Sequence, residues 1–194
     1  YLLARENLTD HLSQNEKQKK VRQRLLKIRA KKVIVATGSL ERPLVFDNND
    51  RPGIMLSSAV KKYANYYGVA TGQKIIFFTN NDTAYEGAIS LNKKGINIEA
   101  IIDTREKSST EHTKEAESLG IKIYNSRTVV DTKGYKRINK ITIMKLSKDG
   151  QSFANSDKIT LDCDCLAISG GWTPAVHLFT QSGGKLKFRD EDQV

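Results

Sequence analysis

The sequence predicts an α/β protein in which a nested βαβαβ domain with a parallel sheet interrupts part of a second, outer domain. Two apolar runs near opposite ends of the chain support this prediction, Val33–Ala36 and Leu166–Ser169. Each is too short for a typical helix and is followed within two residues by glycine, as expected of a buried parallel strand that ends at a tight turn. Between the runs, strand and helix patterns alternate. We therefore assign residues 1–51 and 161–194 to the outer domain and residues 52–160 to the nested one.

The composition is that of a folded protein, because 38% of the 194 residues are apolar, enough to bury a core in one large or two small domains. The formal net charge is +10, and most of the excess lies in Lys17–Lys32. Because this segment contains no aromatic residue that could stack on bases, we expect no nucleic-acid partner. Because no run approaches the roughly 18 apolar residues that span a bilayer, we expect no membrane segment and a cytoplasmic location.

The first 55 residues carry several local patterns. Four leucines at near-helical spacing predict a helix within residues 1–15. In Lys17–Lys32, basic residues partly alternate with apolar ones, which favours a solvated strand. Residues 40–55 contain two prolines, an Asn-Asn-Asp run and a glycine, which predicts a crossing loop. The chain begins at Tyr1 with the second half of a domain, so we interpret it as a piece of a longer protein.

A helix and an alternating series of elements follow. Ser57 or Ser58 could cap a helix that runs to Tyr67 and ends near Gly68. The next segments follow the order βαβαβ and span residues 74–79, 83–94, 97–103, 110–119 and 121–125. A glycine stands after each helix of this series, where a left-handed cap is favoured. Strands joined by such helical crossovers form a parallel, Rossmann-like sheet.

An antiparallel element follows the alternating series. Three segments rich in β-branched residues predict its strands, at residues 127–130, 138–146 and 158–161. Residues 148–150, Lys-Asp-Gly, form a hairpin turn between the last two segments. The run Leu166–Ser169 then returns the chain to the outer domain.

The turn after the first strand of the series can be compared with the dinucleotide fingerprint G-x-G-x-x-G/A. The chain has Thr-Asn-Asn-Asp-Thr-Ala at residues 79–84, which keeps only the small third position. Without the glycines, close approach of the backbone to a pyrophosphate is sterically harder. Thr83 and Glu86 form a T-x-x-E capping box, which would satisfy the helix start that a phosphate would otherwise occupy.

Asp103 ends the second strand of the series, where an acid that binds the ribose of a dinucleotide belongs. The alternative is an Asp that begins a turn with Thr104 and Arg105. We keep Asp103 as a candidate cofactor-binding residue.

Cys163 and Cys165 lie two positions apart on a predicted strand, so their side chains point to one face. We interpret them as reduced core thiols, because a reductase dithiol has the spacing Cys-x-x-Cys. The three histidines are scattered in sequence, so we expect no metal site. No residue stands out as a catalytic acid or base.

Longer motifs carry a resemblance to known families. The runs V-I-V-A-T-G-S and L-A-I-S-G-G-W-T-P, which enclose a nested βαβ domain, resemble the flavoproteins with two dinucleotide domains that include thioredoxin and glutathione reductases. More narrowly, A-T-G-S-L-E-R-P-L-V-F-D-N-N-D-R-P-G-I-M, F-T-N-N-D-T-A-Y and I-S-G-G-W-T-P-A-V-H-L are similar to the alpha subunits of heterotetrameric sarcosine oxidases. The Thr-Asn-Asn-Asp stretch is part of that likeness, which covers nearly the whole chain.

The resemblance implies that the chain is the middle of such a subunit. That family oxidatively demethylates sarcosine to glycine, H2O2 and 5,10-methylenetetrahydrofolate, and it uses FAD and FMN in the assembled enzyme. The partners implied are the beta, gamma and delta subunits. The alpha subunit would hold NAD, and tetrahydrofolate would bind through a C-terminal domain outside this sequence.

The resemblance also implies particular cofactor-binding residues. Two turns would back the bound dinucleotide, and their residues are Thr37, Gly38, Ser39, Gly170, Gly171 and Trp172. Glycine permits the close backbone approach that such turns need. The alternative is that both turns are ordinary loops at strand ends.

Three functions are open on the sequence. The first is a nucleotide-associated, non-catalytic scaffold within a sarcosine oxidase alpha subunit. The second is a fragment of an NAD(P)H-dependent flavoprotein reductase that passes a hydride to a flavin, which the missing glycines disfavour. The third is a subunit-interaction module that docks through the basic segment and the loop Leu44–Met55. We expect the isolated fragment to be inactive.

Overall fold

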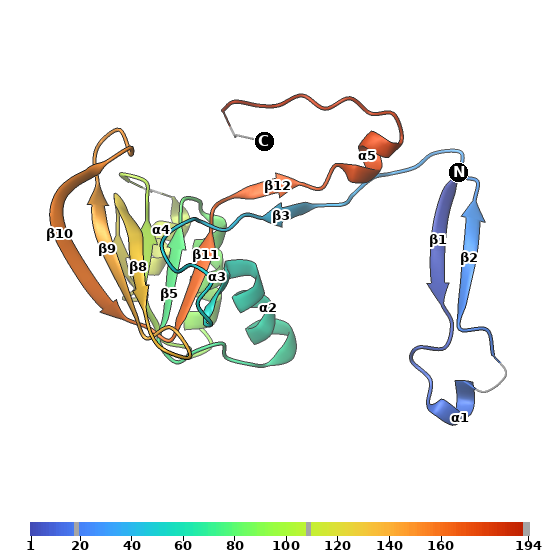
Figure 1. Cartoon of the computed structure of the whole chain (residues 1–194), viewed down its shortest axis with the longest axis horizontal. Helices are drawn as coiled ribbons and strands as arrows, with labels where there is room; N and C mark the ends of the chain where they lie inside the picture. Colours follow the sequence, from blue (N-terminus) through green and yellow to red (C-terminus); the bar gives the residue numbers. More distant parts are fainter. Residues whose placement is uncertain (18–19, 108–109, 192–194) are drawn as a thin grey trace. The chain divides into compact units, whose positions relative to one another are not determined.

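The computed structural model describes residues 1–17, 20–107 and 110–191 (Figure 1). These residues form two compact units. The first contains Tyr1–Thr37 and Val176–Leu186, and the second contains Gly38–Ala175 and the residues after Leu186. Among the described helices, none combines the length and hydropathy needed to cross a bilayer.

The first unit contains an antiparallel pair of strands, β1 (Leu2–Asn7) and β2 (Gln23–Ile28), in which Leu2 lies opposite Ile28. It also contains the short helices α1 (Gln14–Lys17) and α5 (His177–Gln181). The strand predicted within the basic segment is confirmed as β2, whereas the helix predicted within residues 1–15 is wrong over β1. Pairing with β2 supplies backbone hydrogen bonds along the whole of β1, which outweighs the weak helical spacing of its leucines.

The run Val33–Ala36 does not form the predicted buried strand. No strand pairs with it among the described residues, and Val33 and Ile34 are 55% and 93% exposed. A buried parallel strand needs hydrogen-bonded neighbours and an apolar layer on each face. The described part of the chain supplies neither to this run, so the prediction is wrong here.

The second unit is built around a parallel sheet with the strand order β4-β11-β5-β6-β7. These strands are β4 (Ile54–Leu56), β5 (Ile75–Thr79), β6 (Ile98–Asp103), β7 (Lys122–Tyr124) and β11 (Cys165–Ser169). The helices of this unit are α2 (Ser57–Tyr67), α3 (Thr83–Asn92) and α4 (Glu111–Ser118). Gly68, Gly95 and Gly120 follow these helices with positive φ angles, as left-handed helix ends require. The predicted helix ending at Gly68 and the predicted βαβαβ series are therefore confirmed, but the predicted cap at Ser57 or Ser58 is wrong, because both serines lie within α2.

The parallel sheet is covered on both faces (Figure 1). Helices α2, α3 and α4 pack on one face, and an antiparallel sheet with the order β10-β9-β8 packs on the other. The antiparallel strands are β8 (Arg127–Lys133), β9 (Lys140–Leu146) and β10 (Phe153–Asp162). Along β5, Ile75 and Phe77 pack among the helices, whereas Ile76 and Phe78 pack against the antiparallel sheet. Because alternate side chains of β5 enter different apolar layers, the strand is apolar through Phe78.

Strand β11 lies between β4 and β5, with Leu166 beside both Ile54 and Ile76. The sequence-based assignment placed this strand in the outer domain, and the structure differs. All residues of β11 are buried, and such a run suits an inner position in any parallel sheet, so its composition cannot tell which sheet it joins. After β11 the chain forms an antiparallel ribbon, in which β12 (Trp172–Pro174) pairs with β3 (Ser39–Glu41).

Candidate dinucleotide site

The turn after β5 and the turn after β11 meet at the carboxyl edge of the parallel sheet. The two strands are neighbours, and the chain leaves β5 through α3 toward β6, on the side of β5 opposite to β11. Ligands of open α/β sheets bind at such a reversal of strand order, outside the carboxyl ends of the strands. We call residues 79–83 and 169–172 the switch point, and it is the candidate dinucleotide site.

Asn81 ties the turn after β5 to the end of β11. Its side-chain nitrogen donates to the carbonyl and the hydroxyl of Ser169, at 3.2 and 3.0 Å. The Thr79 hydroxyl closes the same turn, because it accepts the Asn81 N–H and donates to the Asn81 carbonyl, each at 3.0 Å. The turn is therefore bonded to the chain itself where a fingerprint turn faces a pyrophosphate.

The start of α3 is also occupied by Asn81. The Asn81 side-chain oxygen accepts the Thr83 N–H at 3.2 Å and the Thr83 hydroxyl at 2.5 Å. The Thr83 hydroxyl in turn accepts the indole N–H of Trp172 at 2.9 Å. The predicted Thr83–Glu86 capping box is wrong, because Asn81 provides the cap and Glu86 lies 3.5 Å from Lys61 instead. The turn does not fit a pyrophosphate, because residues 79–83 include no glycine and the Thr83 N–H at the helix start already donates to Asn81.

Asp103 is fully buried at the end of β6. Its carboxylate accepts the Tyr85 hydroxyl at 2.8 Å, the Arg105 N–H at 2.9 Å and the Arg105 guanidinium at 2.7 Å. The guanidinium also lies 2.7 Å from Asp82, and the hydrogen bonds to Asp103 and Asp82 raise the pKa of Arg105. Burial, followed by the Asp103 carboxylate, raises the pKa of Tyr85. A ribose at Asp103 stays a prediction, and it would require these bonds to break.

The first glycine turn leads into the β3–β12 ribbon. Ser39 pairs with Pro174, and the Gly38 carbonyl accepts the Ala175 N–H at 2.9 Å. Gly38 has a φ of +68°, and a Cβ there would meet nothing within 4 Å. Gly38 is therefore required by its backbone conformation, and the open space beside it fits close approach of a ligand. Thr37 precedes it at the end of the first unit.

The second glycine turn is approached by the chain's own backbone. The Gly170 N–H donates to the Arg42 carbonyl at 2.7 Å, and a Cβ on Gly170 would lie 2.8 Å from the Pro43 carbonyl oxygen. Gly171 has a φ of +99°, and a Cβ there would lie 3.1 Å from the Arg42 guanidinium. The room that these glycines leave is thus used by residues 42 and 43, and their contact with a dinucleotide stays a prediction.

The thiols of Cys163 and Cys165 are buried in the second unit. Burial raises the pKa of both and brings that of Cys163 to about 12. The Cys165 sulfur lies 3.4 Å from the Thr71 hydroxyl. Because the thiolate is the reactive form, these pKa values make both cysteines poor nucleophiles at neutral pH.

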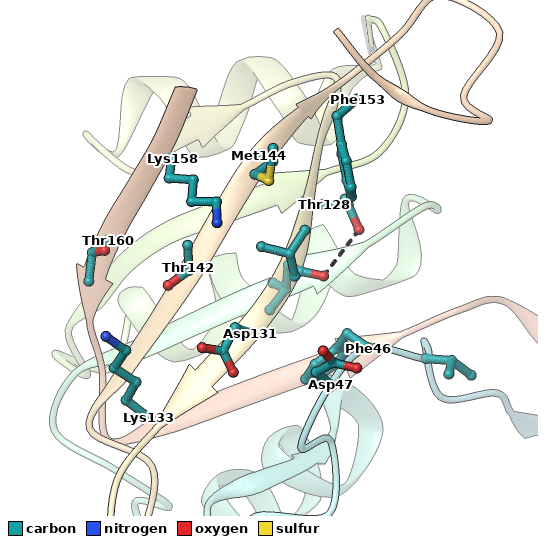
Figure 2. Close-up of a pocket in the computed structure, with 13 residues that line it drawn as sticks. Phe46, Asp47, Thr128, Asp131, Lys133, Thr142, Met144, Phe153, Lys158 and Thr160 are labelled. Carbon is teal, nitrogen blue, oxygen red and sulfur yellow. Dashed lines mark hydrogen bonds between the residues drawn. The ribbon is translucent and has the colours of Figure 1, made fainter. Parts of the chain in front are cut away.

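A cavity of about 740 Å³ lies on the antiparallel sheet rather than at the switch point. Thr142 and Met144 line it on the sheet, together with Phe46 and Phe153, and the Lys158 side chain extends toward Thr142 (Figure 2). Among the described residues, its hydroxyl groups contact no base that could activate them. In the same part of the chain, no group of His, Cys, Asp and Glu lies where it could hold a metal ion.

Sequence reasoning missed two residues that shape this region, Glu41 and Tyr85. Glu41 lies within the predicted crossing loop, and no local pattern indicates that its carboxylate accepts hydrogen bonds from Ser57 and Ser58. Tyr85 carried a weak signal, because a tyrosine in the first turn of a helix between two buried strands needs a partner for its hydroxyl. Asp103, the nearest strand-end acid, is that partner.

Comparison with known sequences gives a consistent result. The sequence pattern described as "Pyridine nucleotide-disulphide oxidoreductase" matches residues 6–194. The chain is 38% identical over 188 residues to the sarcosine oxidase subunit alpha of Corynebacterium sp. (strain P-1), which covers 96% of this chain and 19% of that subunit. It is 37% identical over 163 residues to the sarcosine oxidase subunit alpha of Rhizobium meliloti (strain 1021), a match that covers 84% of this chain and 15% of that subunit. The matched stretches thus cover only 19% and 15% of the length of these two relatives.

Solved structures are similar in fold. Thioredoxin reductase from T. acidophilum has a TM-score of 0.60 at 17% identity, over 79% of this chain and 48% of that one. L-proline dehydrogenase from P. horikoshii has a TM-score of 0.52 at 23% identity, over 85% and 26%. These similarities confirm the predicted α/β fold of the dinucleotide-binding type.

Proposed function

The chain belongs to the pyridine nucleotide-disulphide oxidoreductase family, and from this premise we propose that it is the middle segment of a sarcosine oxidase alpha subunit. The observation that carries the proposal is the identity of 38% to such a subunit over 96% of this chain. The assembled enzyme would oxidatively demethylate sarcosine to glycine, H2O2 and 5,10-methylenetetrahydrofolate, with oxygen as the electron acceptor.

Within that enzyme, this segment acts as a framework rather than as a catalytic centre. Three features of the second unit support this role. The polar groups of the switch point are bonded to one another, as in the contact of Asn81 with Ser169. The two thiols are buried, and the large cavity holds no activated nucleophile among the described residues.

The proposed cofactor of this segment is NAD, held at the turn of Thr37, Gly38 and Ser39. The positive φ of Gly38 and the open space beside it support this placement. Gly170, Gly171 and Trp172 are further candidate contacts by resemblance, and Asp103 is one by its position at the end of β6. FAD and FMN belong to the assembled enzyme, tetrahydrofolate to a domain beyond this segment, and the proposed partners are the beta, gamma and delta subunits.

The proposal is tested by co-expressing the alpha subunit that contains this segment with beta, gamma and delta subunits. Sarcosine-dependent H2O2 is then measured with a peroxidase-coupled dye, and residues 1–194 alone serve as the comparison. We expect peroxide from the complex and none from the isolated chain. A complex that binds its flavins but forms no peroxide contradicts the proposed reaction, and peroxide from the isolated chain contradicts the framework role.

A second candidate function, docking of another subunit, is favoured by an exposed aromatic face on α2. Tyr63, Tyr66 and Tyr67 are 44%, 78% and 58% exposed, and the rings of Tyr66 and Tyr67 lie 4.9 Å apart. Tyrosines are enriched among the residues that dominate binding energy at interfaces. Tyr66→Ala is expected to weaken co-purification of the partner subunits, whereas Tyr135→Ala, at a residue 94% exposed in the antiparallel element, is the matched control. Equal co-purification of the two variants argues against docking at α2.

A further inference from the structure

We propose that the switch point of the second unit is closed to dinucleotides by its own side chains, and that Asn81 and Arg105 are the residues that close it. This goes beyond the proposed function, because it assigns a place where the segment does not hold its nucleotide. It also narrows the candidate NAD contacts to the Gly38 turn, because Asp103, Gly170, Gly171 and Trp172 then contact no dinucleotide.

Asn81 occupies the donor that a pyrophosphate would use. In dinucleotide sites, the N–H groups at the start of the helix after the first strand point at the phosphates. Here the Thr83 N–H donates to the Asn81 side-chain oxygen at 3.2 Å. Residues 79–83 contain no glycine that would let a phosphate approach the backbone. The amide oxygen of Asn81 therefore stands in for a phosphate oxygen.

The Asn81 side chain is fixed from its other end as well. Its nitrogen donates to the carbonyl and the hydroxyl of Ser169, which is itself fully buried. The Trp172 indole donates to the Thr83 hydroxyl and so joins the two turns above this contact. A phosphate that displaced Asn81 would leave the buried Ser169 groups without this donor, which is unfavourable.

Arg105 closes the position of the ribose. It bridges Asp82 and Asp103, with a shortest distance of 2.7 Å to each, and the Asp103 side chain is 0% exposed. A ribose hydroxyl would have to take an Asp103 oxygen from Arg105 or from Tyr85. If Arg105 lost its Asp103 oxygen, its partly buried guanidinium would keep only Asp82 as an acidic partner. If Tyr85 lost Asp103, its buried hydroxyl would be left unpaired. Both outcomes oppose ribose binding.

The experiment is calorimetric titration of residues 1–194 with NAD and, separately, with inorganic pyrophosphate. We expect Asp103→Asn, which keeps the shape of the acid, to leave any NAD affinity unchanged within about twofold, and Gly38→Ala to abolish it. Asn81→Gly frees the Thr83 N–H and restores a fingerprint glycine, so we expect pyrophosphate affinity to rise at least about tenfold. Asn80→Gly, one residue earlier in the same turn, is the matched control and is expected to show no gain.

Circular dichroism establishes that each variant is folded. A tenfold loss of NAD affinity in folded Asp103→Asn overturns the proposal, because it reveals an open ribose site. A folded Asn81→Gly without a gain overturns the role of Asn81. If a variant does not fold, amide hydrogen exchange of the unaltered chain is measured with and without NAD. Slower exchange of residues 80–85 in the presence of NAD overturns the proposal, and unchanged exchange supports it. Neither result depends on the peroxide assay of the assembled enzyme.

Discussion

The Ser57 hydroxyl donates a hydrogen bond of 2.5 Å to the carboxylate of Glu41, which lies 16 positions earlier in the chain. The second Glu41 oxygen accepts the Ser58 N–H at 2.9 Å. Glu41 belongs to β3 and is only 9% exposed. Because Leu56, the residue that precedes α2, has no side-chain acceptor, the start of α2 is capped from the β3–β12 ribbon. The ribbon and the helix are therefore coupled.

Glu41→Gln is expected to lower the free energy of unfolding by about 1–2 kcal/mol. The substitution keeps the size of the side chain, but it removes the charge and turns one acceptor into a donor that faces a hydroxyl or an N–H. Urea denaturation followed by circular dichroism measures the change. Glu117→Gln, on the exposed side of α4, is the control and is expected to stay within about 0.5 kcal/mol of the parent. Equal effects of the two substitutions would contradict the cap.

Tyr85→Phe is expected to flatten the loss of stability at alkaline pH. The pKa of Tyr85 is raised above its ordinary value of 10.0, so the folded state holds this proton more tightly than the unfolded state does. The resulting stabilisation is complete below about pH 10 and is lost as the pH rises toward the folded-state pKa. Denaturation midpoints at pH values from about 9 to 11 should therefore fall more steeply for the parent than for the variant. Tyr135→Phe, at an exposed tyrosine, should behave like the parent.

Native Cys163 and Cys165 are expected to react with a thiol-specific disulfide reagent at least about 100-fold more slowly than the same cysteines in urea at pH 8. Burial keeps the reagent away from both sulfurs and raises both pKa values, that of Cys163 to about 12. The absorbance of the released reagent thiol measures the rate. Rapid reaction of the native chain would show that one of these sulfurs is accessible and ionised.

Gly170→Ala is expected to destabilise the chain more than Gly38→Ala does. A methyl group on Gly170 would lie 2.8 Å from the Pro43 carbonyl oxygen, so the backbone at this crossing must move. At Gly38 the space is open, and only the left-handed conformation is strained, at a cost of about 1–2 kcal/mol. Thermal midpoints of the two variants give the comparison. A reversed order would mean that the crossing at Gly170 is looser than described.

The elements with local signals could be predicted from the sequence, and those that depend on distant partners could not. The series from β5 to β7 has its own periodicity and its own helix-ending glycines, Gly95 and Gly120. By contrast, Val33–Ala36 and Leu166–Ser169 look alike as short apolar runs before a glycine. Only the second finds hydrogen-bonded neighbours among the described residues, and those neighbours are strands far away in the chain. A short apolar run indicates that a strand can be buried at that position, but it does not indicate which strands it pairs with.

The candidate site shows the same division. The missing glycines of residues 79–83 predict a poor pyrophosphate turn, because steric approach depends on residue types that the sequence displays directly. The sequence also predicts that Thr83 and Glu86 cap the start of α3. This prediction is wrong, because any nearby acceptor can cap a helix start. The geometry selects Asn81, which is held by Ser169, a residue 88 positions away. Such a partner is visible only once β5 and β11 are known to be neighbours.

The place of β11 also governs how this unit forms during translation. Strand β4 has β11 as its sheet neighbour in the described chain, and β5 has β11 on one side. A ribosome releases β4, α2 and β5 long before Cys165–Ser169, so one edge of the nascent β5 stays unpaired and β4 stays without a partner until late in synthesis. An exposed apolar strand edge of this kind is a target for chaperones and for misassociation with other chains. The edges of β4 and β5 are therefore protected from chaperone binding and misassociation only when β11, the last strand of the sheet to be synthesised, has emerged.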